Sequence, residues 1–437
     1  MLETKNLRAL WGFKRIGKRT YVIIALMLAA LFSSKPILAQ NRADTTLMRY
    51  LQGEGLNPYP ARDIAILTTG HDLMESLFHD IDNAKRKVWI EFFIIANDSV
   101  GKLCIHHLEQ AARRGCEVRM ITDDYKDWER GYGMRTPKGR DSIRSLGIDF
   151  VTFDRFGFPW VNHLCRDHRK VVNIDDSIGY IGGFNIADYY VHGNPSYGGW
   201  RDTHIRITGA AVEGLARMFH KQYQFLGTGG KGKYTFSRYL FDRDYALQND
   251  STPQIVYFER GRENRKKKAE ARRAIIAAFD AARDTIRLVS PYLLPTHTVR
   301  QALIRAIDRG VHVEILFSKK GDMDILSYGN YHFSKRLVRH GAHVFLYRGD
   351  FHHSKIMMID GKVSMVGSVN MNSRSLKYDY ESACFVFDSD LTARLTRIFE
   401  QDKLRCDTFS LEYYKTEIPR EFRRKGWWTD RFLTPFF

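Results

Sequence analysis

Residues 168–175 read HRKVVNID and residues 353–360 read HSKIMMID, so one pattern of histidine, lysine and aspartate occurs twice along the chain. A glycine- and serine-rich tract with an asparagine follows each copy, at 182–185 (GGFN) and at 367–370 (GSVN). A lone histidine and lysine two positions apart occur by chance on many strands. Two copies with matching downstream tracts indicate instead that the chain contains two related halves.

The repetition extends beyond these stretches. Apolar residues at 104, 108, 111 and 112 have the spacing of one helix face, and the same spacing recurs at 299, 303, 306 and 307, an offset of 195 residues. A glycine follows each helix (Gly115 and Gly310), and an apolar strand follows each glycine (through Val118 and Val313). We therefore predict an α/β fold of two similar halves, with central mixed or parallel sheets and an active site at their interface.

This pattern divides the chain into five parts. Residues 1–40 form a separate hydrophobic segment, 41–230 the first half, 231–255 a linker, 256–410 the second half and 411–437 a C-terminal tail. Glycines at 227, 229, 230 and 232 interrupt any regular helix or strand pattern, and they indicate where the first half ends and the linker to the second half begins. The offset between the halves falls from 195 to 185 residues at the histidine motifs, so a longer loop is expected in the first half, at about 154–166.

Residues 1–40 have the pattern of a targeting or anchoring segment. Basic residues at 14, 15, 18 and 19 precede an apolar run at 21–32, and the small residue Ala39 follows. Such a run makes about 18 Å of helix, short of the roughly 30 Å hydrocarbon core of a bilayer. The segment is thus expected to be a cleaved signal peptide, an uncleaved membrane anchor or a buried helix. The first two place the rest of the chain outside the cytoplasm.

The charge balance favours anionic partners. The formal net charge is +18, which suits phospholipid headgroups, nucleic acid or phosphorylated metabolites. Residues 260–268 hold six bases, as a solvated helix face or as a membrane or phosphate patch. The tail mixes bases with Trp427, Trp428 and phenylalanines at 432, 436 and 437, and is expected either at a lipid interface or packed back on the domain. The five scattered cysteines form no CxxC pair, which argues against a disulfide framework and a structural zinc site.

Strand geometry separates the roles within the motif. Residues two apart on a strand share a face, so His168 and Lys170 point the same way, and so do His353 and Lys355. If the halves meet face to face, these four side chains gather in one pocket. We take them as the catalytic set.

The motif aspartates and the carboxylates further along are expected to support the histidines. Asp175 and Asp360, which complete the catalytic motif, lie at turns and are expected to act mainly by holding backbone. A carboxylate on a later strand of the same half should orient each histidine by bonding one ring nitrogen. The candidates are Asp202 for the first half and Glu381 for the second.

The combined set suits a phosphodiester. One histidine attacks phosphorus, and the other protonates the departing alcohol and then activates the incoming one. The two lysines neutralise the phosphoryl oxygens, and Asn185, Ser368 and Asn370 are the expected substrate-binding residues. No acidic cluster in the sequence resembles a divalent-ion site, so we expect neither a metal nor another cofactor.

The paired HxKxxxxD motifs with their Gly-Gly/Ser-x-Asn tracts resemble the phospholipase D superfamily. Its members build one active site between two similar α/β halves and pass through a phosphohistidine. Longer stretches are similar to bacterial cardiolipin synthases, at 166–170, 182–188, 200–206, 290–295, 367–381 and 431–437. The resemblance covers about residues 60 to 437.

This resemblance implies phosphatidyl transfer between two phosphatidylglycerol molecules, giving cardiolipin and glycerol. It implies that His168 is the nucleophile and His353 the acid and base, roles that the sequence itself does not assign. The chain departs from the family in two places. It has one apolar N-terminal segment where such synthases typically have two, and Asn372 stands where an aspartate is common.

Other functions remain open for the same site. A hydrolytic phospholipase D would use water in place of the second lipid. A phosphodiesterase nuclease would fit the net charge, but nucleic-acid binding usually adds stacking aromatics along a basic groove. A lipid-binding scaffold would not need the histidines at all. We expect anionic phospholipid (phosphatidylglycerol) and a membrane surface as partners, and no nucleic acid; the oligomeric state is left open.

Overall fold

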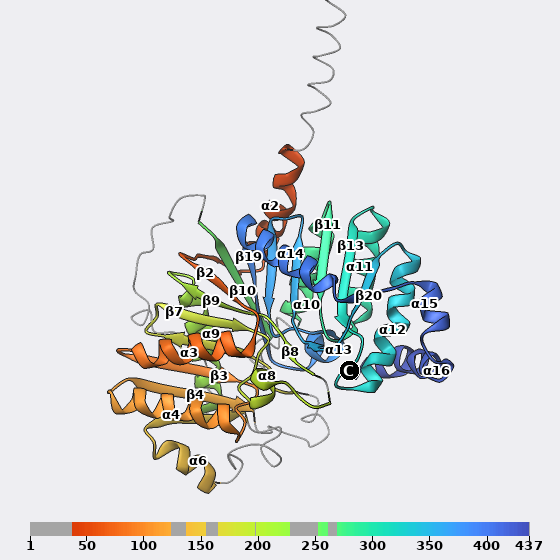
Figure 1. Cartoon of the computed structure of the whole chain (residues 1–437). Coiled ribbons are helices and arrows are strands. Elements are labelled where there is room, and N and C mark those ends of the chain that lie inside the picture. The colour runs from red at the N-terminus through yellow and green to blue at the C-terminus, as the bar shows by residue number, and fades with distance from the viewer. Residues whose placement is uncertain are drawn as a thin grey trace, which may run out of the picture.

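The computed structural model describes residues 37–123, 137–153, 165–196, 198–227, 252–260 and 269–436 (Figure 1). Nearly all of the predicted signal or anchor segment, most of the predicted linker, most of the loop expected at about 154–166 and most of the basic run 260–268 lie outside the described residues. Within the described ranges, no helix is both long and apolar enough to cross a bilayer.

The first half is built on a seven-stranded mixed sheet. Its strands, in spatial order, are β2 (Ile64–Leu67), β9 (His204–Thr208), β7 (Ile178–Gly182), β6 (Lys170–Ile174), β3 (Lys87–Phe92), β4 (Glu117–Asp123) and β5 (Ile148–Phe153). Strands β3, β4 and β5 are parallel, whereas β6, β7 and β9 pair antiparallel. Helices α3 (Gly70–Asn83) and α4 (Ser99–Arg113) pack on one face, and α9 (Val212–Gly227) on the other. The short helices α6 (Pro137–Arg144) and α8 (Asp188–His192) complete this half.

The second half is built on a nine-stranded sheet. Its strands, in spatial order, are β1 (Pro58–Pro60), β10 (Gln254–Arg260), β19 (Glu381–Phe387), β17 (Val363–Gly367), β16 (Ile356–Ile359), β11 (Thr285–Val289), β13 (His312–Ser318), β14 (His343–Tyr347) and β20 (Cys406–Phe409). Its helices are α2 (Ile37–Gly53), α10 (Glu270–Ala281), α11 (His297–Asp308), α12 (Asp324–Arg339), α13 (Ser373–Lys377), α14 (Ser389–Lys403), α15 (Leu411–Thr416), α16 (Arg420–Trp428) and the π-helical turn η3 (Thr429–Leu433). Short two-stranded ribbons join β12 (Leu293–Leu294) to β18 (Met371–Asn372) and β15 (Phe351–His352) to β8 (Trp200–Arg201).

The two sheets repeat one strand order. The series β9-β7-β6-β3-β4-β5 in the first half corresponds to β19-β17-β16-β11-β13-β14 in the second, and the parallel and antiparallel pairings match. Helices α4 and α11 are the two predicted from the repeated apolar spacing. The α/β fold of two similar halves is therefore confirmed.

The inner faces of the two sheets share one hydrophobic core. Val171, Ile181 and Ile205 of the first sheet cluster there with Val366 and Val386 of the second, together with residues of α9 and α14. Alternate residues of β6 face opposite sides of the first sheet. Val171 faces the core between the two sheets, and Val172 faces a second core that the first sheet forms with α3 and α4. The halves are thus joined by apolar packing, which fixes the interface where the site lies.

The N-terminal residues pack on the second half, whereas the sequence analysis assigned 41–60 to the first. Leu47 and Leu51 of α2 are buried in the core with α10, and β1 pairs antiparallel with β10. Residues 41–60 had been assigned to the first half only because they precede it directly in the chain. The free edge of β10 offers unpaired backbone groups, and the preceding segment fills it. Helix α2 begins at Ile37, ahead of the cut predicted near Ala39.

The C-terminal tail packs back on the domain. Tyr414 and Ile418 are buried in the core of the second half, and α16 runs against α12 (Figure 1). Gly426 lies so close to Tyr328 O that a Cβ there would meet it. Trp427 and Trp428 nevertheless remain exposed. The packed alternative is therefore the one observed, and one face of the tail stays open to solvent.

Candidate active site

The two motif histidines precede equivalent strands, β6 and β16, and each is fastened to the opposite half. His168 N donates to Tyr380 O over 2.9 Å, beside a parallel bridge between Asp167 and Tyr380. His353 N donates to Arg201 O over 2.6 Å, where β15 pairs with β8. Backbone pairing at matching positions of the two halves thus brings both histidines to the interface.

The carboxylates that hold the histidines come from the opposite halves. His168 Nδ1 lies 3.1 Å from Glu381 Oε2, and His353 Nδ1 lies 2.6 Å from Asp202 Oδ2. Our prediction that each carboxylate serves the histidine of its own half was wrong, although both residues do hold a histidine. The cause lies in the two backbone pairings between the halves, β15 with β8 and Asp167 with Tyr380. Each pairing places a histidine of one half beside the residue that precedes the carboxylate of the other half.

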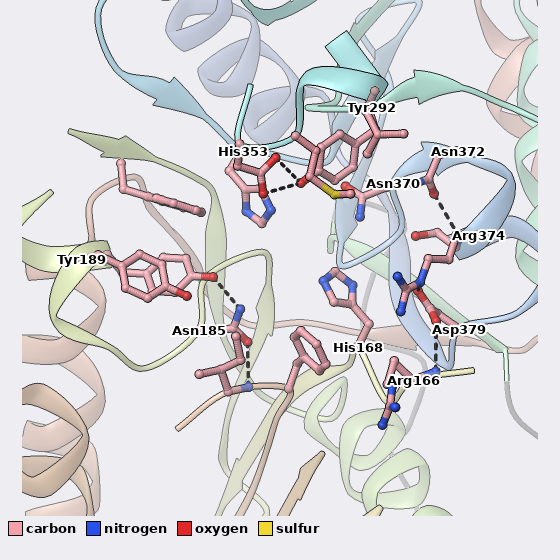
Figure 2. Close-up of a pocket in the computed structure, with 18 of the residues that line it drawn as sticks. Arg166, His168, Asn185, Tyr189, Tyr292, His353, Asn370, Asn372, Arg374 and Asp379 are labelled. Atoms are coloured by element: carbon pink, nitrogen blue, oxygen red, sulfur yellow. Dashed lines mark hydrogen bonds and ion pairs between the residues drawn. The ribbon is translucent and has the colours of Figure 1, made fainter. Parts of the chain in front are cut away.

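Both histidines line a single cavity of about 380 Å³. Figure 2 shows the rings of His168 and His353 directed toward the same space, with Asn185 and Asn370 at its sides. Two imidazoles far apart in the sequence therefore converge, as the duplicated motif predicts. Their Nδ1 atoms are held by carboxylates, so Nε2 of each ring is the atom suited to act on a bound group. In His353 this Nε2 also lies 2.9 Å from Lys355 Nζ.

The two cavity asparagines are held differently. Asn185 Nδ2 donates to Tyr190 OH at 2.6 Å, and its Oδ1 accepts from Ile94 N at 3.2 Å. Asn370 Oδ1 is buried and accepts no hydrogen bond from the residues that the structure describes. Asn370 therefore keeps more capacity to bind a ligand than Asn185, whose amide mainly fixes the cavity wall.

Ser368 does not line the cavity. Its hydroxyl donates to Glu381 Oε2 and accepts from Ser382 N at 3.0 Å, and the side chain is fully buried. The sequence suggested substrate binding, but the structure places this hydroxyl behind Glu381, where it fixes the carboxylate that holds His168. Asn370 of the same tract, and not Ser368, lines the cavity.

The two motif lysines lie beneath the histidines and are almost fully buried. Lys170 Nζ donates to His168 O at 2.6 Å. Lys355 Nζ donates to His353 O and lies 2.8 and 2.9 Å from the two ring nitrogens. Burial lowers the pKa of Lys170 to about 7 and that of Lys355 to about 8. Neither lysine is among the residues that line the cavity, so the prediction that both lysines share the pocket with the histidines was wrong. Each lysine instead holds the backbone of its histidine, and where it is protonated its charge favours an anionic ligand nearby.

Burial also lowers the pKa of both histidines. The pKa of His353 falls to about 4, through burial first and then Lys355, although Asp202 opposes the change. The pKa of His168 lies well below its ordinary value, again through burial first and then Lys170 and Lys355. Both rings are neutral near pH 7 in the protein alone. An anionic phosphate held between them would raise both pKa values.

The two orienting carboxylates differ in charge. Burial would raise the pKa of Asp202, but Lys355 and His353 together lower it below its ordinary value. Burial raises the pKa of Glu381 to about 7, although Lys170 opposes it. Near neutral pH Asp202 is ionised, and Glu381 is divided between its two forms. His353 thus has the partner that better stabilises an imidazolium.

Asp175 and Asp360 hold backbone at equivalent turns, as expected. Asp175 accepts hydrogen bonds of 2.7–2.8 Å from three successive amides, those of residues 85–87, and Asp360 accepts bonds of 2.8–2.9 Å from the amides of residues 283–285. Both aspartates have positive φ, 53° and 50°. These contacts tie the turn after the motif strand to the start of β3 or β11. They are away from the cavity, so we assign both residues to structure.

Several cavity residues were not singled out from the sequence. An aromatic wall is formed by Phe93, Tyr189, Tyr190 and Trp200. Tyr292 OH donates to both oxygens of Asp322 at 2.7 and 2.8 Å on the His353 side, and Arg374 Nε donates to Asp379 at 2.9 Å on the His168 side. Most of these residues lie within or beside the stretches similar to known synthases. That likeness was their available signal, because periodicity does not distinguish a cavity wall from a core.

Comparison with known proteins identifies relatives of both halves. A family profile described as "Cardiolipin synthase, PLD-like domain" matches residues 77–195 and 275–403, one segment in each half. Cardiolipin synthase 2 of Staphylococcus epidermidis is 31% identical over 366 residues, which cover 83% of this chain and 72% of that protein. A cardiolipin synthase of Geobacillus kaustophilus is 28% identical over 378 residues, which cover 84% and 72%.

Solved structures share the architecture. Phosphatidylserine synthase of Haemophilus influenzae Rd KW20 aligns with a TM-score of 0.65 at 15% identity, over 90% of this chain and all of that one. Polyphosphate kinase of Porphyromonas gingivalis aligns with a TM-score of 0.53 at 16% identity, over 84% of this chain and 51% of that one. At such identities the similarity supports the fold and does not extend to the reaction.

Proposed function

Because the chain belongs to the cardiolipin synthase family of phospholipase D-like proteins, we propose that it transfers a phosphatidyl group between two phosphatidylglycerol molecules and releases glycerol. The convergence of His168 and His353 on one cavity carries this proposal. A phosphodiester seated there would meet one ring nitrogen on each side. The lysines beneath it would counter the charge of the phosphoryl oxygens.

His168 is the nucleophile in the proposed first step. Its Nε2 attacks phosphorus of the first lipid, the phosphorus–oxygen bond to glycerol breaks, and the His353 imidazolium gives its proton to the glycerol oxygen. The products are free glycerol and a phosphatidyl group on His168. The ionised Asp202 beside His353 supports the cationic acid, and the half-neutral Glu381 suits a neutral nucleophile.

The second step reverses the proton transfer. Neutral His353 takes the proton from the primary hydroxyl of a second phosphatidylglycerol, whose oxygen then attacks the phosphorus held on His168. The bond from phosphorus to His168 breaks, which frees His168, and cardiolipin leaves. His353 then holds the proton taken from the hydroxyl, as it does with substrate bound at the start of the first step, and it loses this proton to solvent once the cavity is empty. Asn370, whose amide oxygen is unpaired among the described residues, is suited to hold a lipid hydroxyl near His353.

The proposed place of the reaction is the membrane surface. The basic residues ahead of the apolar run at 21–32 favour export or anchoring, with the catalytic part on the extracytoplasmic side. Protease added to intact cells would digest the catalytic part if this orientation holds. Protection until the membrane is broken would contradict it.

Thin-layer chromatography of lipids after incubation with labelled phosphatidylglycerol tests the reaction. We expect labelled cardiolipin and free glycerol. Phosphatidic acid as the sole labelled product would establish hydrolysis, with water in place of the second lipid. An unchanged lipid pool would refute both.

Replacement of His168 tests the shared cavity. We expect His168→Asn to lower the turnover by about 10³-fold or more, because it removes the nucleophile. The exposed His343 of β14 provides a matched control, and His343→Asn should keep full activity. A phosphatidyl adduct on quenched wild-type protein, stable in base and lost in acid, should be absent from His168→Asn. Full turnover by His168→Asn would remove the basis of the mechanism.

A further inference from the structure

Three large aromatic side chains near the end of the chain, Trp427, Trp428 and Phe432, form one exposed cluster. Together with the exposed Phe436, four residues further along the chain, we call them the C-terminal aromatic face. The exposed fractions are 47% for Trp427, 53% for Trp428, 48% for Phe432 and 52% for Phe436. Trp428 and Phe432 have ring centroids 4.8 Å apart, and Trp427 lies 5.2 Å from Trp428 and 5.9 Å from Phe432. A contiguous exposed patch of this kind marks an interaction surface more often than scattered apolar residues do.

The C-terminal aromatic face stands on a firmly packed support. On the other side of α16, Gly426 lies against α12, where the Tyr328 carbonyl would block any Cβ. Arg300 of α11 donates to Asp430 and, at 3.1 Å, to Thr434 Oγ1, which is itself buried. The tail therefore presents its aromatic rings because the opposite face is occupied.

Positive charge borders the C-terminal aromatic face. The two acids of α16 and η3 are already engaged, Glu421 with Lys425 and Asp430 with Arg300. Arg420, Arg424 and Arg431 are exposed, and Arg424 also lies near enough to Glu421 to lower the pKa of that carboxyl. A partner that covers this surface must therefore accept both aromatic rings and cationic side chains.

More bases lie on the adjacent part of α12 and in α15. The pKa of Lys335 is lowered by burial first and then by the nearby charges of Arg339, Arg423 and Lys415. Such crowding of like charges is stable only where solvent or a counter-charge relieves it. A second copy of this chain would bring the same positive surface against itself. An anionic surface would relieve it.

We propose that the C-terminal aromatic face docks on an anionic lipid bilayer, with its tryptophans and phenylalanines in the headgroup region and its arginines on acidic headgroups. Tryptophan is enriched at this depth because its ring is apolar and its N–H is polar. Bases beside apolar rings add attraction to anionic lipid.

The position of the face relates it to the cavity. Helix α12, on which α16 packs, begins beside Met323 and Leu326, and both line the cavity. Arg300, which holds η3, also donates to Pro295 O at 2.7 Å, close to the wall residue Tyr292. In Figure 1, α16 lies at the same end of the sheets as α13 and α8, which also contribute cavity residues. A bilayer seated on the face would lie next to the cavity rim, which also includes the exposed Met323.

Quenching of tryptophan fluorescence tests docking without any reference to catalysis. Full-length protein is mixed with vesicles of phosphatidylglycerol and phosphatidylcholine that carry bromine on the upper acyl chain. We expect quenching in the wild type, and most of it should disappear in the Trp427→Phe/Trp428→Phe variant, which keeps the aromatic area. Equal quenching in both proteins, or none in either, would overturn the proposal.

Turnover gives a second readout, whose interpretation rests on the function proposed above. In the Trp427→Ser/Trp428→Ser/Phe432→Ser variant, we expect KM for vesicle phosphatidylglycerol to rise roughly tenfold or more, because three interfacial rings are lost. The kcat/KM for a short-chain, monomeric phosphatidylglycerol should stay within about twofold of wild type. The control variant Leu103→Ser/Leu404→Ser removes apolar side chains exposed by 46% and 83% elsewhere and should match wild type in both assays.

The two readouts separate the possible failures. Absence of transfer with either substrate, while quenching persists, would refute the proposed reaction and leave the docking face intact. An equal loss with both substrates would mean that the face supports the fold and not the membrane contact. A change from dimer to monomer in the serine variant by sedimentation would assign the face to a second copy, against the proposal.

Discussion

At the scale of single residues, the lysines show that the site is arranged at the expense of stability. Lys170 is fully buried, and burial lowers its pKa to about 7, although Glu381 and Asp202 oppose this change, so below that pH the fold must hold a charge away from solvent. An aliphatic side chain at this position has no charge, so its burial would not lower the free energy of unfolding in this way. We therefore expect Lys170→Met to raise the melting temperature by a few degrees at pH 6, for a gain on the order of 2–4 kcal/mol, while it lowers transfer activity by 10²-fold or more.

The sign of this effect with pH is fixed by the direction of the pKa shift. Between about pH 7 and 10 the unfolded chain keeps a proton on Lys170 that the folded protein has released, so wild-type stability rises with pH in that window. The advantage of Lys170→Met should therefore be larger at pH 6 than at pH 9, as scanning calorimetry at both values would show. Lys102→Met on the exposed face of α4 serves as the control and should change the melting temperature neither at pH 6 nor at pH 9. A melting temperature that falls at pH 6 would contradict this account of the buried charge.

At the scale of elements, the turns after the two motif strands carry the second prediction. Asp360 accepts three backbone hydrogen bonds with two oxygens. Asparagine can adopt the positive φ of this turn, but its Nδ2 cannot accept the bond from Arg283 N. We expect Asp360→Asn to lower the free energy of unfolding by about 1–3 kcal/mol. Asp175→Asn should cost a similar amount, because it occupies the same turn of the other half.

Denaturant titration measures these losses, and transfer assays at low temperature show what remains of catalysis. Both variants should keep most of their activity while folded, because the aspartates are held against backbone and not in the cavity. The control is Asp390→Asn at the exposed start of α14, which should change neither the free energy of unfolding nor the activity appreciably. A variant that stays stable but loses activity 10²-fold would mean that the motif aspartate acts in the chemistry.

The elements also show what could be predicted from sequence. The helix spacing at 104–112 and 299–307 and the paired motifs were enough for the fold class, because each is a local pattern repeated at a nearly constant offset. The partners of His168 and His353 could not be found in this way. They depend on two short pairings between the halves, the two-residue ribbon of β8 with β15 and the single bridge of Asp167 with Tyr380, and such short pairings leave no periodic signal. The placement of α2 and β1 on the second half could not be predicted for a different reason, because their position in the chain, ahead of the first half, was the only guide.

At the scale of the whole molecule, these crossings make each half depend on the other. Asp202 belongs to the first half but holds His353, and Glu381 belongs to the second but holds His168. The coupling should therefore appear in double-mutant cycles on stability. We expect interaction energies of about 0.5–3 kcal/mol for Asp202→Asn with His353→Asn and for Glu381→Gln with His168→Asn.

The same-half pairs provide the matched control for these cycles. Asp202→Asn with His168→Asn, and Glu381→Gln with His353→Asn, change the same four side chains in the other combination, so any general loss of charge in the cavity is common to both sets. Their interaction energies should be smaller, because neither pair is in hydrogen-bond contact. Urea unfolding of the four single and four double variants gives all the values. Stronger coupling within a half than across the interface would mean that the histidines exchange partners in solution, and the different roles assigned to them through Asp202 and Glu381 would then lose their support.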